Sequence, residues 1–314
     1  MPTLLATGIA AGGVGVECLE TVILEYARKI PIQSWTFILA QHDPRSSRSR
    51  EAVQRLQSLE PKLPGLKVEA HECDLSKLES VRNFAARVKQ EVKDGIEVML
   101  LNAGAVFQDG PRFTEGVEET TMVNHIGHFL LLALLKDQLR SAEGFKAKVV
   151  FTGSELHKRA DPAQTWEQLS LTPGSIRPGY KYDAMQAYGC AKLLQAYCLP
   201  HWSSLLSPHN TTVTIASPGF VPSTLLSRSS PWHHRLLMNH VIHYAPFART
   251  PAQGGRSIAR VICDEEHLGG RTGVFVDKAG NVVEMHGDVY VEESAKKVWN
   301  RTCEIAEVKE LVIA

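Results

Sequence analysis

The segment Tyr188-Gly189-Cys190-Ala191-Lys192 places a phenol and an amine four residues apart in a stretch with helical periodicity. Residues four apart share one face of a helix, so both groups can address the same small volume. An isolated phenol has a pKa near ~10, and a neighbouring ammonium lowers that pKa by favouring the phenolate. The pair therefore predicts proton transfer near neutral pH. Tyrosine and lysine at this spacing are common by chance, so the prediction depends on the rest of the sequence.

The elements that would position this pair alternate along the chain. Short β-rich apolar runs separate longer stretches whose apolar residues recur every three or four positions. This alternation predicts an α/β fold with a doubly wound parallel sheet of about seven strands and helices on both faces. The expected strands are 3–7, 36–40, 67–71, 97–101, 148–152, 212–216 and 273–276, and the expected helices are 16–29, 48–59, 78–92, 118–139, 184–206 and 250–263.

Two stretches, 155–183 and 220–247, interrupt this alternation, and no repeat or linker divides the chain, so we expect one domain over residues 1–314. Long connections in an α/β domain are more often binding loops or lids than filler. The second stretch could enclose a bulky apolar molecule, although a plain packing helix would use the same side chains. These side chains are Trp232, Leu236, Leu237, Met238 and Tyr244.

Composition and charge exclude several classes of function. Lys plus Arg and Asp plus Glu both number 34, so there is no excess positive charge for nucleic-acid binding. The six cysteines are scattered, without a zinc-ligand spacing, and indicate reduced thiols in a cytoplasmic protein with no metal. The N-terminus has no basic stretch before its apolar run, and the longest apolar run, 129–135, is too short to span a bilayer. Peripheral attachment to a membrane through 225–247 stays an alternative.

Polar and glycine motifs follow the ends of the expected strands. The first strand runs into a turn, Thr7 to Gly15, whose glycines would let the backbone approach a pyrophosphate at a helix N-terminus. Asn124 lies in the middle of an expected helix, where asparagine is unfavourable and needs a reason. The later strands are followed by Asp74-Leu75, Asn102-Ala103-Gly104, Gly153-Ser154 and Pro218-Gly219.

In this order, the motifs from Thr7 to about Val276 resemble the short-chain dehydrogenase/reductase family, whose fold is of the Rossmann type. The segments 155–157, 188–195 and 250–255 are similar to its retinol-dehydrogenase-like and ketosteroid-reductase-like branches. The resemblance implies an NAD(P)-dependent oxidoreductase that interconverts a carbonyl and an alcohol on a bulky lipophilic molecule such as a steroid, retinoid or polyketide. It leaves a homodimer open. A non-catalytic binding or scaffold protein with an impaired cofactor loop is the alternative.

The resemblance also implies which residues hold the cofactor. The family's glycine pattern can be placed in two registers. Gly13 and Gly15 fit it if this loop is one residue longer than the family's, whereas Gly12 fits it without an insertion but puts Val14 at the position of the last glycine. Asp43 favours NAD(H), whereas three nearby arginines favour NADP(H), which we expect. The implied cofactor-binding residues are Gly8, Gly13, Gly15, Arg45, Asp74, Asn102, Ala103, Gly104, Tyr188, Lys192, Pro218, Gly219 and Ser223, with Arg48, Arg50 and Thr224 nearby.

The same resemblance implies four catalytic residues. Tyr188 would exchange a proton with the substrate oxygen, which Ser154 would orient. Lys192 would lower the pKa of the phenol and hold the ribose beside the nicotinamide. Asn124 would help to hold a water that links Lys192 to solvent. Gly153 stands where the family carries the first serine of a pair, and Asn102 would tie the central sheet together.

Overall fold

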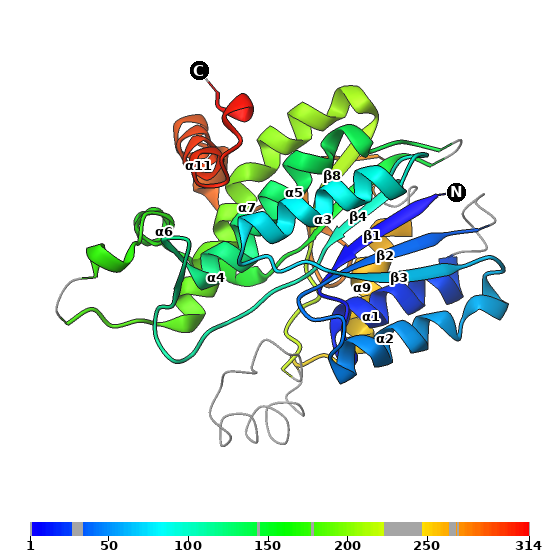
Figure 1. Cartoon of the computed structure of the whole chain (residues 1–314). Helices are drawn as coiled ribbons and strands as arrows, with labels where there is room; N and C mark the ends of the chain where they lie inside the picture. Colours follow the sequence, from blue (N-terminus) through cyan, green and yellow to red (C-terminus); the bar gives the residue numbers. More distant parts are fainter. Residues whose placement is uncertain are drawn as a thin grey trace.

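Apolar runs form the strands of one central sheet in the computed structural model, which describes residues 2–26, 34–142, 145–176, 179–222, 247–263, 268 and 270–313. The sheet has eight strands in the order β10-β9-β8-β7-β4-β1-β2-β3 (Figure 1). Every neighbouring pair is parallel except β9 and β10. The strands are β1 Thr3–Thr7, β2 Thr36–Gln41, β3 Lys67–Glu72, β4 Val98–Leu101, β7 Ala147–Thr152, β8 Thr211–Ala216, β9 Val274–Val276 and β10 Val282–Val283.

The expected fold class and all seven expected strands are confirmed, with boundaries shifted by a residue at most. The sequence did not indicate β10, which has two residues and pairs antiparallel with β9 at the edge of the sheet. A separate two-stranded hairpin, β5 Phe113–Thr114 with β6 Val117–Glu118, was also not expected. Both are too short to show a strand period.

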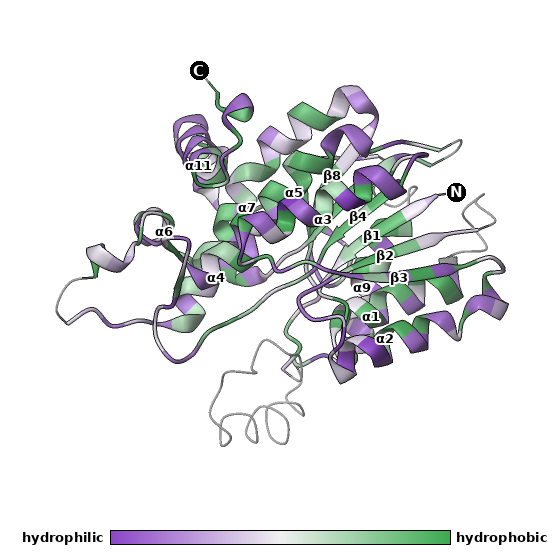
Figure 2. Cartoon of the chain, viewed as in Figure 1, coloured by the Kyte–Doolittle hydropathy of each residue, from purple (hydrophilic) through white to green (hydrophobic). Residues whose placement is uncertain are grey.

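Helices cover both faces of the sheet. On one side lie α1 Val14–Thr21, α2 Ser47–Gln57 and α9 Pro251–Cys263; on the other lie α3 Leu78–Glu91, α5 Gly127–Leu135 and α7 Ala184–Leu206 (Figure 1). Successive residues of β1 alternate between the two cores, because Leu4 and Ala6 pack with α1 and α9 while Leu5 packs with α3 and α5. All residues of β1 and β4, in the middle of the sheet, are buried, whereas the edge strand β3 is mixed and the outer surface of α2 is hydrophilic (Figure 2).

The expected helix 118–139 is interrupted where it passes the sheet. It consists of α4 Glu119–Thr121, a π-helical turn η3 Met122–Ile126, α5, and a short 3₁₀ segment at Lys136–Gln138. The helix expected at 16–29 likewise continues α1 as a π-helical turn, Val22–Tyr26, and its residues 27–29 lie outside the described chain. Short π-helical turns are rare and often mark functional sites. The turn η3 contains Asn124.

The two interruptions differ in what the structure describes. Within 155–183 the chain forms a 3₁₀ turn η5, Glu155–Arg159, and a helix α6, Pro162–Leu169. Residues 223–246, which carry the expected lid, lie outside the described chain. Among the described residues, no helix has both the length and the apolar character that crossing a membrane requires.

A further helix, α11 Glu292–Ile305, was missed by the sequence analysis and packs against α7. Its Trp299 contacts Phe129 of α5 and Trp202 of α7, each with ring centroids 4.9 Å apart. These edge-on aromatic contacts help to bury Phe129 and Trp202 within the chain.

The strand order places a ligand site. From β1 the chain winds outward to β2 and β3, then returns to β4 on the other side of β1 and continues to β7 and β8. Ligands of open α/β sheets bind where this reversal occurs, beyond the carboxyl ends of the strands. The ends of β1, β4 and β7 are therefore the place where functional side chains should gather.

The contact between α1 and α9 gives a stability prediction. A Cβ at Gly255 would lie 2.6 Å from the main-chain nitrogen of Cys18, so α9 would have to move away from α1. We expect Gly255→Ala to destabilise the fold by about 1–3 kcal/mol, the usual cost of overpacking. Urea unfolding measures this, with Gly287→Ala as the control because a Cβ there has no neighbour within 4 Å. Equal midpoints for the two variants would contradict the close packing.

Candidate functional site

The turn after β1 is pressed against the end of β4. Gly8 has φ +69°, its N–H donates to Ala40 at 3.1 Å, and a Cβ would come 2.5 Å from the Cα of Ala103. A Cβ on Gly15, in the first turn of α1, would lie 2.5 Å from Nδ2 of Asn102. Only glycine allows the turn and the helix to approach this closely.

The remaining glycines lie at the tip of the turn. Gly12 has φ +77° and open space where a Cβ would be, and Gly13 precedes α1 without a side-chain cap. Val14 is the first residue of α1, and Gly15 holds the position of closest helix–strand packing. This arrangement corresponds to the longer of the two loop registers. The first N–H groups of a helix have no partner within the helix, so this end of α1 can receive an anion.

The hydroxyl of Thr7, the last residue of β1, organises the centre of the site. Its Oγ1 accepts the N–H groups of Asn102 and Ala103, each at 2.9 Å. With both lone pairs used, the hydroxyl must donate to Nε2 of His128, 2.9 Å away. His128 is therefore neutral, and its Nδ1–H donates to the carbonyl oxygen of Asn124 at 3.3 Å. Burial lowers the pKa of His128 to about 3, in agreement with a neutral ring.

The side chain of Asn102 links three neighbouring strands. Its Nδ2 donates to the main-chain oxygens of Thr7 and Gly8, each at 3.2 Å. Its Oδ1 accepts from Oγ1 of Thr152, the last residue of β7, at 3.1 Å. The next residues carry the main chain out of the sheet, so that Gly104 is exposed.

Asn124 fastens the chain after β4 to the helix that contains η3. Its Nδ2 donates to the main-chain oxygens of Ala105 and Thr120, at 2.7 and 2.8 Å, and its Oδ1 accepts from the N–H of Ala105 at 3.2 Å. These contacts explain an asparagine in mid-helix. The main-chain carbonyl oxygen of Asn124 accepts from two side chains, those of His128 and Gln195.

Lys192 is buried and held by two acceptors. Its Nζ donates to the carbonyl oxygen of Thr152 at 2.9 Å and to Oε1 of Gln195 at 3.1 Å. Burial lowers the pKa of Lys192 to about 7. Neither Gln195, three residues after Lys192, nor His128, four residues after Asn124, was among the residues expected at the site. Helical spacing from a candidate residue was the available signal.

The ring of Tyr188 is buried among apolar groups, including Val106, Leu156 and Tyr182, and lies 5.5 Å from Nζ of Lys192. The structure therefore brings the two residues of the sequence motif together. The phenol differs from the expectation in one respect, because burial raises its pKa above the ordinary value. In the chain alone, desolvation outweighs the neighbouring amine, and Tyr188 is protonated at neutral pH.

Ser154 lies two residues after the end of β7 and caps the turn η5, where its Oγ accepts the N–H of Leu156 at 3.3 Å. Gly153 precedes it because a Cβ would collide with the side chain of Ile215 on β8. A serine at position 153 does not fit this backbone. His157 is buried and hydrogen-bonds through Nδ1 to the carbonyl oxygen of Ser154 at 2.7 Å, which steadies the turn.

Asp74 lies beyond the end of β3 and is used within its own turn. Its Oδ1 accepts from the N–H and the hydroxyl of Ser76, at 3.0 and 2.7 Å. Its Oδ2 lies 3.3 Å from Nζ of Lys77 and 3.7 Å from Nε2 of His42. Burial opposes ionisation of Asp74, but the hydrogen bonds from Ser76 outweigh it, so its pKa lies below the ordinary value.

The arginines after β2 lie on the surface. The side chain of Arg45 is 87% exposed, with Nε 3.8 Å from Oδ1 of Asp43. Arg48 and Arg50 are also exposed, at the start of α2. The main-chain oxygen of Arg48 accepts the N–H of Ala11, so this helix end lies against the glycine turn. Of the three arginines, it is therefore the main chain of Arg48 that contacts the loop.

The turn after β8 is held by a half-buried arginine. NH1 of Arg249 donates to the carbonyl oxygens of Pro218 and Lys278, at 3.0 and 3.1 Å. Gly219 has φ +75°, and a Cβ there would lie 2.8 Å from Cδ of Arg249. The expected contacts at Ser223 and Thr224 lie outside the described residues.

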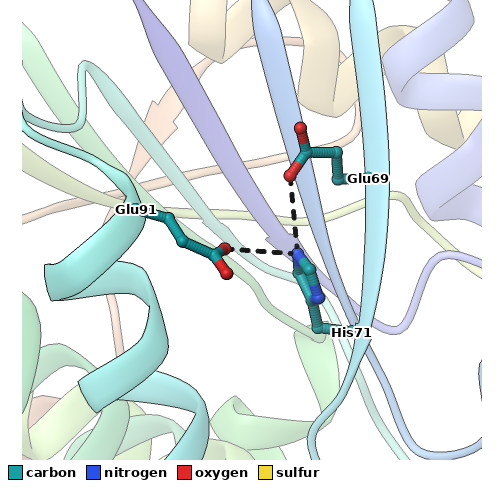
Figure 3. Close-up of side chains that lie close together, drawn as sticks. All are labelled: Glu69, His71 and Glu91. Carbon is teal, nitrogen blue, oxygen red and sulfur yellow. Dashed lines mark ion pairs between the residues drawn. The ribbon is translucent and has the colours of Figure 1, made fainter.

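A separate cluster lies at the edge strand β3, where Nε2 of His71 is 3.6 Å from carboxylate oxygens of both Glu69 and Glu91 (Figure 3). Arg87 donates to Nδ1 of His71 at 3.1 Å. Because an arginine can only donate, the ring proton of a neutral His71 is on Nε2, facing the carboxylates. No lone pair of Nε2 is then directed at the space that a metal ion would take.

The network around Thr7 gives a second stability prediction. Thr7→Val keeps the side-chain shape but leaves the N–H groups of Asn102 and Ala103 without their acceptor. We expect a loss of about 1–3 kcal/mol for each unsatisfied buried donor. Chemical denaturation measures it, with Thr212→Val as the control, because that half-buried hydroxyl makes one long bond of 3.4 Å. A Thr7→Val variant as stable as the control would show that the hydroxyl is dispensable.

Comparisons with known proteins agree with this geometry. The model of the family described as short chain dehydrogenase matches residues 24–165. The chain is 33% identical over 271 residues to a WW domain-containing oxidoreductase of Gallus gallus, covering 85% of this chain and 60% of that protein. It is 27% identical over 252 residues to a polyprenol dehydrogenase of Homo sapiens, covering 79% of this chain and 72% of that protein.

A solved structure shares the fold. An NADPH-bound carbonyl reductase from chicken fatty liver has a TM-score of 0.60 at 17% identity, covering 90% of this chain and 98% of that one. The family match, the relatives and the shared fold all point the same way. The chain belongs to the short-chain dehydrogenase/reductase family.

Proposed function

We propose that the chain is an NADP(H)-dependent oxidoreductase, with NAD(H) as the alternative cofactor, that interconverts a carbonyl and an alcohol on a bulky lipophilic molecule. The observation that carries the proposal is the pair on α7: a buried Tyr188 phenol beside a buried Lys192 amine that is fixed to the end of β7. This pair lies where the strand order reverses, the position at which open α/β sheets bind ligands.

The residues at the strand ends fit a dinucleotide. Gly12 leaves the backbone open because nothing lies within 4 Å of where its Cβ would be, Gly8 lets the turn pass close to Ala103, and the uncapped N-terminus of α1 suits a pyrophosphate. We assign cofactor contacts to these glycines, to Gly13 and Gly15, to Arg45, Asp74, Asn102, Ala103, Gly104, Tyr188, Lys192, Pro218 and Gly219, and to Ser223 outside the described chain. When bound, the nicotinamide supplies or accepts the hydride.

The side chains of the chain handle the proton. Tyr188 is protonated at neutral pH, since a phenol is protonated there and burial raises its pKa further, so its Oη carries the proton that a carbonyl oxygen would accept. Ser154 would hold that oxygen through its hydroxyl. Lys192 would hold the ribose beside the nicotinamide, and its positive charge would favour the phenolate that the donation leaves behind. Asn124 holds the helix that carries η3 against the chain after β4.

A lipophilic substrate is supported by the surroundings of the phenol. Val106, Leu156 and Tyr182 pack around Tyr188, and Ile176 and Met185 are exposed nearby in sequence. Apolar walls with a few polar groups are usual for small-molecule sites. The matched human protein is named for a polyprenol, which is a long apolar alcohol. We assign substrate selection to 155–183 and to 220–247, most of which lies outside the described residues.

The proposal also covers domain organisation, location and partners. We propose one nucleotide-binding domain over 1–314, a cytoplasmic location with peripheral membrane contact through 225–247 as an alternative, and no nucleic-acid partner. A homodimer stays open.

The proposal is tested first by titrating the chain with NADPH and then screening ketones and aldehydes by the loss of NADPH absorbance. Saturable binding with turnover of apolar carbonyls supports the proposed function. Absence of saturable binding of either cofactor would favour a non-catalytic scaffold, in agreement with the lengthened glycine loop.

Tyr188→Phe removes the hydroxyl and keeps the ring. We expect kcat to fall by on the order of 10²-fold to 10⁴-fold, the usual contribution of a general acid, while NADPH affinity changes little. Steady-state kinetics on the best carbonyl measure the loss. Tyr290→Phe, at an exposed tyrosine outside the site, is the control. A Tyr188→Phe variant that keeps most of its kcat would remove the phenol from the mechanism.

Arg45→Ala and Arg48→Ala test the choice of cofactor. If these arginines bind the 2′-phosphate, each change should weaken NADPH binding by roughly 10-fold or more, as expected for a lost charged hydrogen bond, and leave NADH binding unchanged. Calorimetric titration measures both affinities. Arg301→Ala is the control, because Arg301 pairs with Glu304 on α11. Equal affinity of the unmodified chain for the two cofactors would contradict the NADP(H) assignment.

A further inference from the structure

Gln195 bridges the amine of Lys192 to the main chain of the facing helix. Its Oε1 accepts from Nζ of Lys192 at 3.1 Å, and its Nε2 donates to the carbonyl oxygen of Asn124 at 2.6 Å. Both partners fix the orientation of the amide, because a carbonyl oxygen can only accept and an ammonium can only donate. Gln195 is buried, so these contacts are made away from solvent.

The main-chain oxygen of Asn124 accepts from a second side chain as well. Nδ1 of His128 donates to it at 3.3 Å, and Thr7 fixes that tautomer by donating to Nε2 of the same ring. The shorter of the two bonds, at 2.6 Å, is the one from Gln195. A water between Lys192 and Asn124, which the family resemblance implies, would compete with the amide of Gln195 for this oxygen.

We propose that Gln195 is a positioning residue that holds Lys192 in its working place and stands where the family resemblance implies a water. This inference rests on the proposed function, since it concerns the lysine of the same site. An amide does not give up its protons near neutral pH. The link from Lys192 to Asn124 therefore orients the amine and does not conduct protons to solvent.

The surroundings of Lys192 make the proposal measurable by pH. Tyr188 faces it from the same helix, His125 and His128 face it from η3 and α5, and β7 offers only the carbonyl oxygen of Thr152. Burial lowers the pKa of both histidines to about 3 and raises that of Tyr188. Among these groups, Lys192 is the one whose pKa, lowered by burial to about 7, falls near neutrality.

Two substitutions at Gln195 should move the pH dependence in opposite directions. In a plot of kcat against pH, the limb that reflects ionisation of Lys192 has its midpoint at the pKa of that amine. Gln195→Met removes the acceptor that favours the ammonium, so this limb should move down by about 1–2 pH units. Gln195→Glu puts a carboxylate beside the amine, so the limb should move up. Gln186→Met and Gln186→Glu, at an exposed glutamine on the same helix, should leave the limb in place. A purely structural role would lower stability or kcat without moving the limb.

A second measurement does not require turnover. Because the pKa of Lys192 is lower in the folded chain, the unfolded chain binds the extra proton between about pH 7 and the ordinary lysine value near ~10.4, and stability rises with pH across that window. The difference in unfolding free energy between the chain and Lys192→Met isolates this contribution. The lower end of this pH window should move to lower pH in Gln195→Met and to higher pH in Gln195→Glu. In each case, the Gln195 variant is compared with the double variant that also carries Lys192→Met.

The two measurements separate the possible failures. If neither the kinetic limb nor the stability window moves in either Gln195 variant, the proposed role of Gln195 is overturned. If no carbonyl is turned over but the stability window moves as expected, Gln195 positions Lys192 and the proposed oxidoreductase function is wrong.

Discussion

The site depends on keeping one buried amine in place. Lys192 is enclosed by protein, and a buried ammonium is costly unless its protons have acceptors. The chain supplies these acceptors through hydrogen bonds that form a closed ring. Starting from Lys192, the ring passes through Thr152, Asn102, Thr7, His128, Asn124 and Gln195 and returns to Lys192. It connects β1, β4 and β7 with η3, α5 and α7, so the ends of three strands and two helices share one set of contacts.

Burial shifts the pKa values of Tyr188 and Lys192 in opposite directions. It raises the pKa of Tyr188 and lowers that of Lys192, because desolvation disfavours the charged form of each. The phenol consequently keeps its proton at neutral pH and is a weaker acid than a free phenol, whereas the amine is close to its own titration point. Small changes in the acceptors around Lys192 therefore change its charge, which explains why residues without contact to a substrate matter.

Much of the fold and part of the candidate site could be predicted from the sequence. Alternating apolar periods identified the seven main strands, and the helical spacing of Tyr188 and Lys192 brought the pair together. The π-helical turn η3 could not be predicted, because its residues show the same apolar period as the helix around it. The closed ring could also not be predicted from the sequence, because it joins residues that are far apart in the chain, such as Thr7 and His128 at a separation of 121 residues. The helix α11 was missed at the end of the chain, and its Trp299 shows its partners only in three dimensions.

The central claim is that Lys192 is held by a hydrogen-bonded ring at a buried position, and that this burial brings its titration close to neutrality. The most direct test is nuclear magnetic resonance of the chain with isotopically labelled lysine, following each side-chain amine as a function of pH. The account predicts one lysine signal that titrates near pH 7 and disappears in Lys192→Met. If every lysine, including the one lost in Lys192→Met, titrates near the ordinary value of ~10.4, the account is contradicted.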